Sequence, residues 1–169
     1  MSRYLRAAVI SVLAMGISNA TLAEELQVST RDGARTAILV RGPQARAPTV
    51  IVLHGALMTA ENTMSWYGFA DAARKRGFAS VYPRGINMLW NDGRDAAWAS
   101  AADDVGFLKR LARDLVVRGT TDPSHLYLVG VSNAAGIRST AAPITFRCFW
   151  APAPSLSRPR IPSCRRSRS

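Results

Sequence analysis

A chain of 169 residues is long enough for one domain around one core, and its hydrophobic content of 48% excludes disorder along the whole length. The formal net charge of +11 first suggests a nucleic acid or an anionic surface as partner, but residues 138–169 hold seven arginines and no acidic residue. Residues 24–137 hold 13 basic and 11 acidic residues, so the body of the chain is nearly neutral and we expect no specific nucleic-acid partner.

Residues 1–23 have the pattern of an export signal. Two arginines precede an apolar stretch at residues 7–17, and small residues follow, with Ala20 and Ala23 as candidate cleavage positions. The apolar stretch is shorter than the roughly 20 residues that a membrane-spanning helix needs, so a membrane anchor is the less favoured alternative. The sequence therefore predicts a secreted or periplasmic protein that has no membrane association after cleavage.

Residues 24–137 alternate between strand patterns and helix patterns. Apolar runs rich in β-branched residues indicate strands that are buried on both faces of a parallel sheet. The alternation predicts an α/β domain with three layers and a mostly parallel sheet. The predicted elements, in chain order, are two strands around a turn at Asp32-Gly33 within residues 26–40, a strand at 49–53, a helix at 61–76, a strand at 78–82, a helix from Asp103-Asp104 to Gly119, and a strand at 126–129 after a turn at Asp122-Pro123.

Apolar spacing also predicts which side chains the two helices bury. The first helix is expected to bury Met64, Tyr67, Ala70 and Ala73, and the second Val105, Leu108, Leu111 and Leu115. Three tryptophans, Trp66, Trp90 and Trp98, are candidates for an aromatic platform that would hold a sugar or phenolic ring, but burial in the core is the interpretation that we favour.

Residues 138–169 have a different character. They hold five prolines and the seven arginines without a helix or strand period, which predicts a disordered, irregular basic tail, or sequence that is not native to the domain. Both cysteines, Cys148 and Cys164, lie in this tail. An exported protein could join them in a disulfide, but the composition around them gives no reason to expect one.

Ser132 is the candidate nucleophile. The run Gly130-Val131-Ser132-Asn133-Ala134 stands where a buried strand should turn sharply into a helix, as a nucleophile elbow requires. Gly130 fits the pattern, whereas Ala134 occupies the place of its second glycine. Because serine in a glycine-flanked turn is common, the motif gains its weight from its position directly after a strand.

His54-Gly55 follows the first core strand and supplies a second element. In hydrolases with such an elbow, an early loop donates one backbone N–H to the oxyanion and the residue after the nucleophile donates the other. The donors here would be Ala56, or as the less favoured alternative Leu57, together with Asn133. We interpret His54 and Gly55 as structural, because His54 precedes the serine on the wrong loop for a general base.

Six ordered motifs between about residues 35 and 133 resemble those of secreted esterases related to polyhydroxybutyrate depolymerases and feruloyl or acetylxylan esterases. The resemblance implies the N-terminal half of an α/β-hydrolase sheet and a Ser–His–Asp carboxylic ester hydrolase with no metal or organic cofactor. It implies a polyester or a plant cell-wall ester as substrate, and leaves the oligomeric state open. The motifs are Val52-Leu53-His54-Gly55, Tyr82-Pro83, Trp90-Asn91-Asp92-Gly93-Arg94, Asp103-Asp104-Val105-Gly106-Phe107-Leu108, Asp122-Pro123 and Gly130-Val131-Ser132-Asn133.

The chain departs from this family after the nucleophile. The family continues Ser-Asn-Gly-Gly, whereas residues 134–136 here read Ala-Ala-Gly, and no Asp, Glu or His follows Ser132. His54 and His125 both precede the serine, although the acid and the histidine of an α/β-hydrolase follow it. We therefore expect an incomplete triad and a nearly or wholly inactive chain. The alternative function is that of a non-catalytic remnant whose basic tail binds polyanions non-specifically.

A reading-frame slip near residue 133 is our hypothesis for this departure. In GC-rich codons the residues 134–136 read GCG-GCG-GGN, and the same bases read from the third position give GGC-GGG, which encodes Gly-Gly. Such a slip would restore the family motif and would explain the Arg- and Pro-rich tail of a truncated or frameshifted chain. Resequencing that stretch of the gene tests the hypothesis.

Overall fold

The computed structural model describes residues 23–93, 100–137 and 146–148. The predicted export signal, apart from Ala23, lies outside these residues, as do residues 138–145 and 149–169 of the predicted tail. None of the helices in the described ranges is long and apolar enough to cross a membrane.

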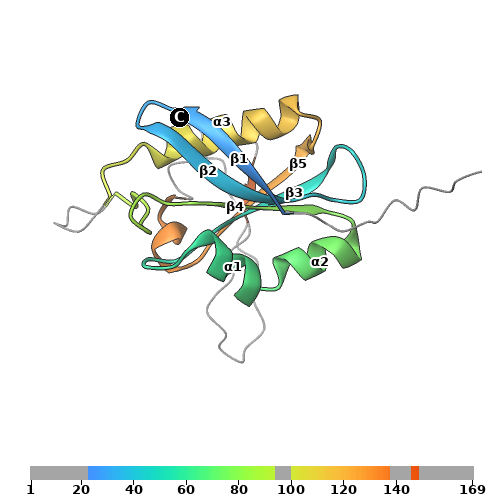
Figure 1. The fold of residues 1–169 in the computed structure, drawn as a ribbon, viewed down its shortest axis with the longest axis horizontal. Helices are drawn as coiled ribbons and strands as arrows, with labels where there is room; N and C mark the ends of the chain where they lie inside the picture. The colour runs from blue at the N-terminus through green and yellow to red at the C-terminus, as the bar shows by residue number, and fades with distance from the viewer. Residues whose placement is uncertain (1–22, 94–99, 138–145, 149–169) are drawn as a thin grey trace, which may run out of the picture.

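A six-stranded sheet forms the centre of the fold, in the order β1-β2-β4-β3-β5-β6 (Figure 1). The pairs β1–β2 and β2–β4 are antiparallel, and β4–β3, β3–β5 and β5–β6 are parallel. Helices cover both faces, with α1 and α2 below the sheet in Figure 1 and α3 above it. This architecture confirms the predicted three-layered α/β fold with a mostly parallel sheet. The strands are β1 (Ala23–Thr30), β2 (Gly33–Val40), β3 (Ala47–Leu53), β4 (Ala79–Pro83), β5 (Thr121–Gly130) and β6 (Phe146–Cys148).

Strand β3 shows why the central strands read as unbroken apolar runs. Ile51 and Leu53 belong to the core cluster that contains the α3 side chains, whereas Val52 belongs to the cluster on the side of α1 and α2. Because successive side chains of a strand point to opposite faces, a strand covered on both faces needs apolar residues at every position.

The predicted single helix at 61–76 is wrong, because two helices occupy this stretch. Helix α1 spans Ala60–Trp66 and α2 spans Phe69–Arg76. Between them Gly68 adopts φ of +66°, a left-handed conformation that ends one helix and redirects the chain. The break removes Tyr67 from the expected buried stripe and leaves it exposed.

Helix α3 spans Asp104–Val117 and begins at the predicted place. The side chain of Asp103 caps it by accepting the backbone N–H of Gly106 at 2.9 Å. The expected stripe is right for its three leucines but wrong for Val105, which is only half-buried. Phe107 is buried instead, since it lies beside Leu108 and Leu111 on the helix face that meets the sheet.

Strand β5 is longer than predicted because the turn at Asp122-Pro123 lies inside it as a bulge. Thr121 pairs with Ala47, whereas the next pairing joins Leu126 to Thr49, so the intervening residues leave the ladder. The N–H of Ser124 donates to Asp122 Oδ1 at 2.8 Å and closes the turn.

Within the predicted irregular tail, the structure describes one element. Strand β6 pairs in parallel with β5, with Phe146 opposite Leu126 and Cys148 opposite Leu128. These three residues therefore depart from the expected lack of regular structure. The pairing gives backbone partners to an edge of β5 that would otherwise be open, which is the physical reason for the difference.

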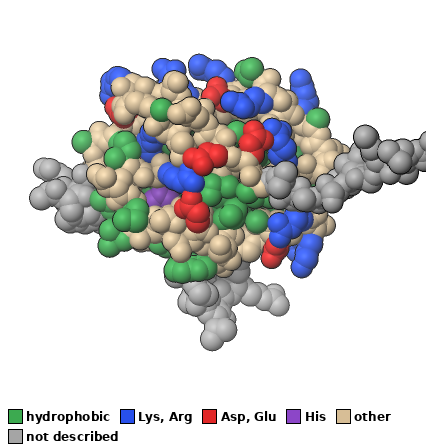
Figure 2. All heavy atoms as spheres, viewed as in Figure 1, with side chains coloured by type: hydrophobic (Ala, Val, Ile, Leu, Met, Phe, Trp, Pro, Cys, Tyr) green, Lys and Arg blue, Asp and Glu red, His purple; other side chains and the backbone are tan. Residues whose placement is uncertain are grey.

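Charged side chains of both signs are interspersed on the face shown in Figure 2. Arg84 contacts Glu25 at 2.9 Å and Glu61 at 2.5 Å, and Arg41 contacts Glu24 at 2.6 Å. Such exposed pairs contribute little to stability, and their mixture agrees with the near-neutral balance of the domain.

Candidate active site

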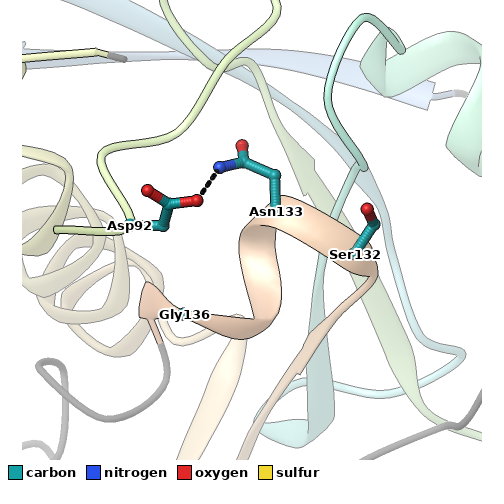
Figure 3. Close-up of a pocket in the computed structure, with 4 residues that line it drawn as sticks. All are labelled: Asp92, Ser132, Asn133 and Gly136. Carbon is teal, nitrogen blue, oxygen red and sulfur yellow. Dashed lines mark hydrogen bonds between the residues drawn. The ribbon is translucent and has the colours of Figure 1, made fainter. Parts of the chain in front are cut away.

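Ser132 lies directly after β5, at the start of η1, a short 3₁₀ helix over Ser132–Ala135 (Figure 3). Its φ is +53°, in the left-handed region that residues with a side chain seldom adopt. Strained backbone of this kind persists where the surrounding structure enforces it, and it is concentrated at functional sites. The strand–serine–helix turn thus has the form of a nucleophile elbow.

Gly130 is required by the close return of the chain after this turn. A Cβ atom on Gly130 would lie 2.6 Å from the carbonyl oxygen of Ala134 and 2.8 Å from its carbonyl carbon. Ala134 itself is fully buried in the main core cluster, so the departure from the second glycine is accommodated by packing. The elbow needs glycine before the serine and tolerates alanine after it.

We expect Gly130→Ala to destabilise the fold by roughly 1–3 kcal/mol or more, because the added methyl group meets backbone that cannot move aside cheaply. Urea denaturation measures the loss. The matched control is Gly55→Ala, whose Cβ would meet nothing closer than Met58 Sδ at 3.3 Å, the end of a flexible side chain. Equal losses for the two variants would contradict the tight return at the elbow.

The loop after β3 lies against Ser132. A Cβ on Gly55 would be 3.6 Å from Ser132 Cβ, so only a small residue leaves room there. The backbone N–H groups of Ala56 and Asn133 make no hydrogen bond to other described residues. The N–H of Leu57 donates to the carbonyl oxygen of Met88 at 2.9 Å, so the alternative donor Leu57 is occupied.

The Asn133 side chain has a role that the sequence did not indicate. Its Oδ1 accepts the backbone N–H of Trp90 at 2.9 Å, and its Nδ2 donates to the Trp90 carbonyl at 3.2 Å. The same Nδ2 reaches Asp92 Oδ2 at 2.5 Å (Figure 3). Both ends of the amide are thus engaged, which holds the residue after the nucleophile in one orientation. The signal in the sequence for this contact between Asn133 and Asp92 was limited to the polar motif around Asp92.

A hollow of about 300 Å³ opens at the elbow, lined by Asp92, Ser132, Asn133 and Gly136 (Figure 3). Gly136 allows the chain to pass close to the preceding loop, because a Cβ there would lie 2.7 Å from Asp92 Cβ. Across residues 23–93, 100–137 and 146–148, no group of three or more His, Cys, Asp or Glu side chains is arranged to hold a metal ion.

His54 is buried beneath the site, and both of its ring nitrogens are engaged. Nε2 accepts the backbone N–H of Gly85 at 2.9 Å, which leaves Nδ1 to donate to the Gly55 carbonyl at 2.8 Å. The ring packs against Trp90 at a centroid distance of 4.8 Å. Burial lowers the pKa of His54, while the Gly55 carbonyl and Asp104 act in the opposite direction. A neutral imidazole with both nitrogens occupied holds the loop and cannot take a proton from Ser132.

The lowered pKa of His54 predicts that acid destabilises the fold. Because the unfolded histidine takes up a proton near its ordinary pKa of 6.5, the stabilisation is present above that pH and is lost as pH falls towards the lower folded value. The slope should reach at most about 1.4 kcal/mol per pH unit. Urea denaturation between pH 7.5 and 5 measures it. His54→Gln should flatten the slope and His125→Gln should not; an unchanged slope in His54→Gln would refute the assignment.

His125 lies in the bulge of β5, seven residues before Ser132 in the chain. Its Nδ1 is 2.6 Å from Asp122 Oδ2 on the exposed bulge, and this hydrogen bond lowers the pKa of Asp122. The strand between Leu126 and the elbow rises by ~3.3 Å per residue, so His125 is well out of reach of the serine hydroxyl. Neither histidine borders the hollow.

The two tryptophans that the structure describes among the three candidates differ in their burial. Trp90 is 1% exposed and belongs to the core, as we favoured. Trp66 is 69% exposed at the end of α1, so core burial is wrong for this residue. Trp98 lies outside the described residues.

No family model matches the chain, and no curated protein matches it significantly. Solved structures do match, and they show that the described part of the chain has the α/β-hydrolase fold. Native sOPH superposes with a TM-score of 0.58 at 20% identity, over 73% of this chain and 47% of that one. An acetyl xylan esterase from Aspergillus awamori has a TM-score of 0.58 at 14% identity, over 72% and 47%. The chain spans about half the length of these two structures.

Proposed function

We propose that the chain carries the nucleophile and the oxyanion-binding part of a carboxylic ester hydrolase, with Ser132 as the nucleophile. One observation carries the proposal: a strained serine at φ +53° stands on a strand-to-helix turn, next to Asn133 and to the loop of Ala56, whose backbone N–H groups make no hydrogen bond within the described part of the chain. The fold likeness to an acetyl xylan esterase supports ester chemistry.

In this proposal the Ser132 hydroxyl oxygen attacks the ester carbonyl carbon, and the hydroxyl proton must pass to a base. The carbonyl oxygen becomes an oxyanion that the two N–H groups stabilise by electrostatics. The tetrahedral intermediate then expels the alcohol, which takes up a proton, and water releases the acid from the acyl-serine. The described residues include the attacking serine and the two N–H groups proposed to bind the oxyanion, but none of them is a histidine within reach of the serine hydroxyl.

The finer assignments rest on the sequence motifs. We propose a relationship to the polyhydroxybutyrate depolymerase-like and feruloyl or acetylxylan esterases, a polyester or plant cell-wall ester as substrate, and little or no activity in the 169-residue chain. We also propose that residues 24–137 form one domain and that a frame slip produced the tail that follows it.

Free imidazole tests the proposed nucleophile, because it can stand in for a missing general base. A fluorophosphonate probe should label the chain in an imidazole-dependent way, and peptide mass spectrometry should place the label on Ser132. Ser132→Ala should lose it, whereas Ser65→Ala, which removes an exposed hydroxyl on α1, should keep it. Labelling that is spread over several serines would refute the proposal.

We propose further that the chain is exported and cleaved before the domain. The cut predicted near Glu24 would place the new N-terminus at the start of β1, where Glu24 pairs with Leu39. Mass spectrometry of the chain recovered from the medium or periplasm should find an N-terminus near Glu24. A chain that retains Met1 in the membrane would contradict export.

A further inference from the structure

A short segment joins the two halves of the proposed oxyanion site. We call residues 89–92 the strap. The strap's Trp90 donates its indole N–H to the carbonyl oxygen of His54 at 2.9 Å, next to the loop that offers Ala56. The backbone of the same residue holds both ends of the Asn133 amide. Trp90 therefore contacts one proposed N–H donor, Asn133, and a residue close to the other, His54, which lies two residues before Ala56.

The strap is itself held by the first residue of α3. Asp104 is 1% exposed, and its Oδ2 accepts the backbone N–H of Asn91 at 2.6 Å. The Asn91 side chain also donates to the carbonyl oxygen of Ala102 at 3.1 Å. Two hydrogen bonds thus tie the strap to the start of the helix.

Arg35 lies behind Asp104 and completes a buried ion pair. Its Nη1 is 2.6 Å from Asp104 Oδ1, and its guanidinium carbon lies 4.0 Å from the centre of the Phe107 ring. Its Nη2 donates to the Arg84 carbonyl at 3.1 Å. Among the described residues Arg35 Nε, Arg35 Nη1 and Asp104 Oδ1 make no hydrogen bond, so the pair is held by the 2.6 Å contact of opposite charges and its polar atoms are imperfectly satisfied.

We propose that Asp104, supported by Arg35, is a positioning residue for oxyanion binding. It fixes the strap so that Trp90 holds Asn133, and with it the N–H that follows Ser132, in place against the loop of Ala56. This inference rests on the proposed function and adds residues that touch neither the substrate nor the nucleophile.

The energetics of buried ion pairs separate this role from a merely structural one. Replacing such a pair by apolar residues of similar volume is often neutral or stabilising. A purely structural pair would therefore leave the elbow unchanged when it is replaced in this way. A positioning pair would leave stability intact and still loosen the strap.

Two matched double variants test the proposal. Arg35→Met with Asp104→Asn removes both charges but keeps an acceptor oxygen for the Asn91 N–H, whereas Arg35→Met with Asp104→Leu removes the acceptor too. Urea denaturation gives stability. Amide hydrogen exchange and the ¹⁵N spectrum report on the Asn133 backbone N–H and its side-chain amide.

We expect the Asn variant to keep the native Asn133 signals. The Leu variant should be about as stable, yet its Asn133 side-chain amide should shift and the exchange of amides in the strap should speed up about tenfold or more, as for a buried hydrogen bond left unmade. Identical signals in the two variants would overturn the proposal. If neither double variant folds, the single variants Asp104→Asn and Asp104→Leu decide, since native Asn133 signals in the first and altered signals in the second support positioning, and equal signals in both refute it. These readouts need no ester chemistry, so a failure of the proposed function stays distinguishable.

Discussion

Without an added base, a fluorophosphonate probe should label Ser132 in the 169-residue chain at least about 10³-fold more slowly than it labels a serine hydrolase with a complete triad. The reason is that a serine hydroxyl is a weak nucleophile until a neighbouring base removes its proton. His54 has both ring nitrogens engaged, and His125 lies in the bulge of β5, paired with Asp122. No Asp, Glu or His follows the serine in these 169 residues.

The rate is measured by quenching the labelling reaction at set times and quantifying the labelled peptide by mass spectrometry. A serine esterase with a complete catalytic triad is the reference. The double variant His54→Gln with His125→Gln is the matched control, and it should label as slowly as the unchanged chain. A fast rate in the unchanged chain that this double variant loses would show that one of the two histidines acts as the base. A fast rate that depends on protein concentration would instead point to a base from a second copy.

The sheet and the elbow could be predicted from the sequence because each depends on local patterns. The β3 run and the helix that starts at Asp103 carry signals within a few residues, namely β-branched apolar runs and a capping carboxylate. Gly130 and Ser132 are likewise adjacent, so the strand-to-helix turn could be recognised before any tertiary contact was known. The helix break at Gly68 carried a local signal as well, but a single glycine inside a helical pattern is ambiguous.

The contacts that organise the site could not be predicted in this way, because they join residues far apart in the sequence. Asn133 meets Trp90 and Asp92 across more than forty residues, and Arg35 meets Asp104 across almost seventy. Apart from Trp90, their side chains are polar, so periodicity does not place them in the core. Only the fold shows that Asp104 of a buried ion pair accepts a hydrogen bond from the strap, and that the strap holds the side-chain amide of Asn133.

Restoring the other reading frame after codon 133 should return labelling and esterase activity together. The frame is expected to encode Gly at positions 134 and 135 and, further on, the acid and histidine loops that α/β-hydrolases place after the serine. A general base and its orienting acid should raise the rate by about 10⁴-fold or more over the 169-residue chain. Hydrolysis of p-nitrophenyl acetate and fluorophosphonate labelling measure the two effects, and Ser132→Ala in the restored protein should abolish both.

The decisive control is the 169-residue chain with Ala134→Gly and Ala135→Gly alone. Ala134 is fully buried and packs in the main core cluster, and Ala135 lies in the 3₁₀ turn, so both changes should cost stability and neither supplies a base. We expect this variant to label no faster than the unchanged chain. If the two glycines by themselves restored labelling, the shape of the elbow would be the limiting feature, and the missing base would not explain the low reactivity of Ser132. If the restored protein stayed inert while folding stably, the frame-slip hypothesis would fail, because the downstream residues would then not complete the site.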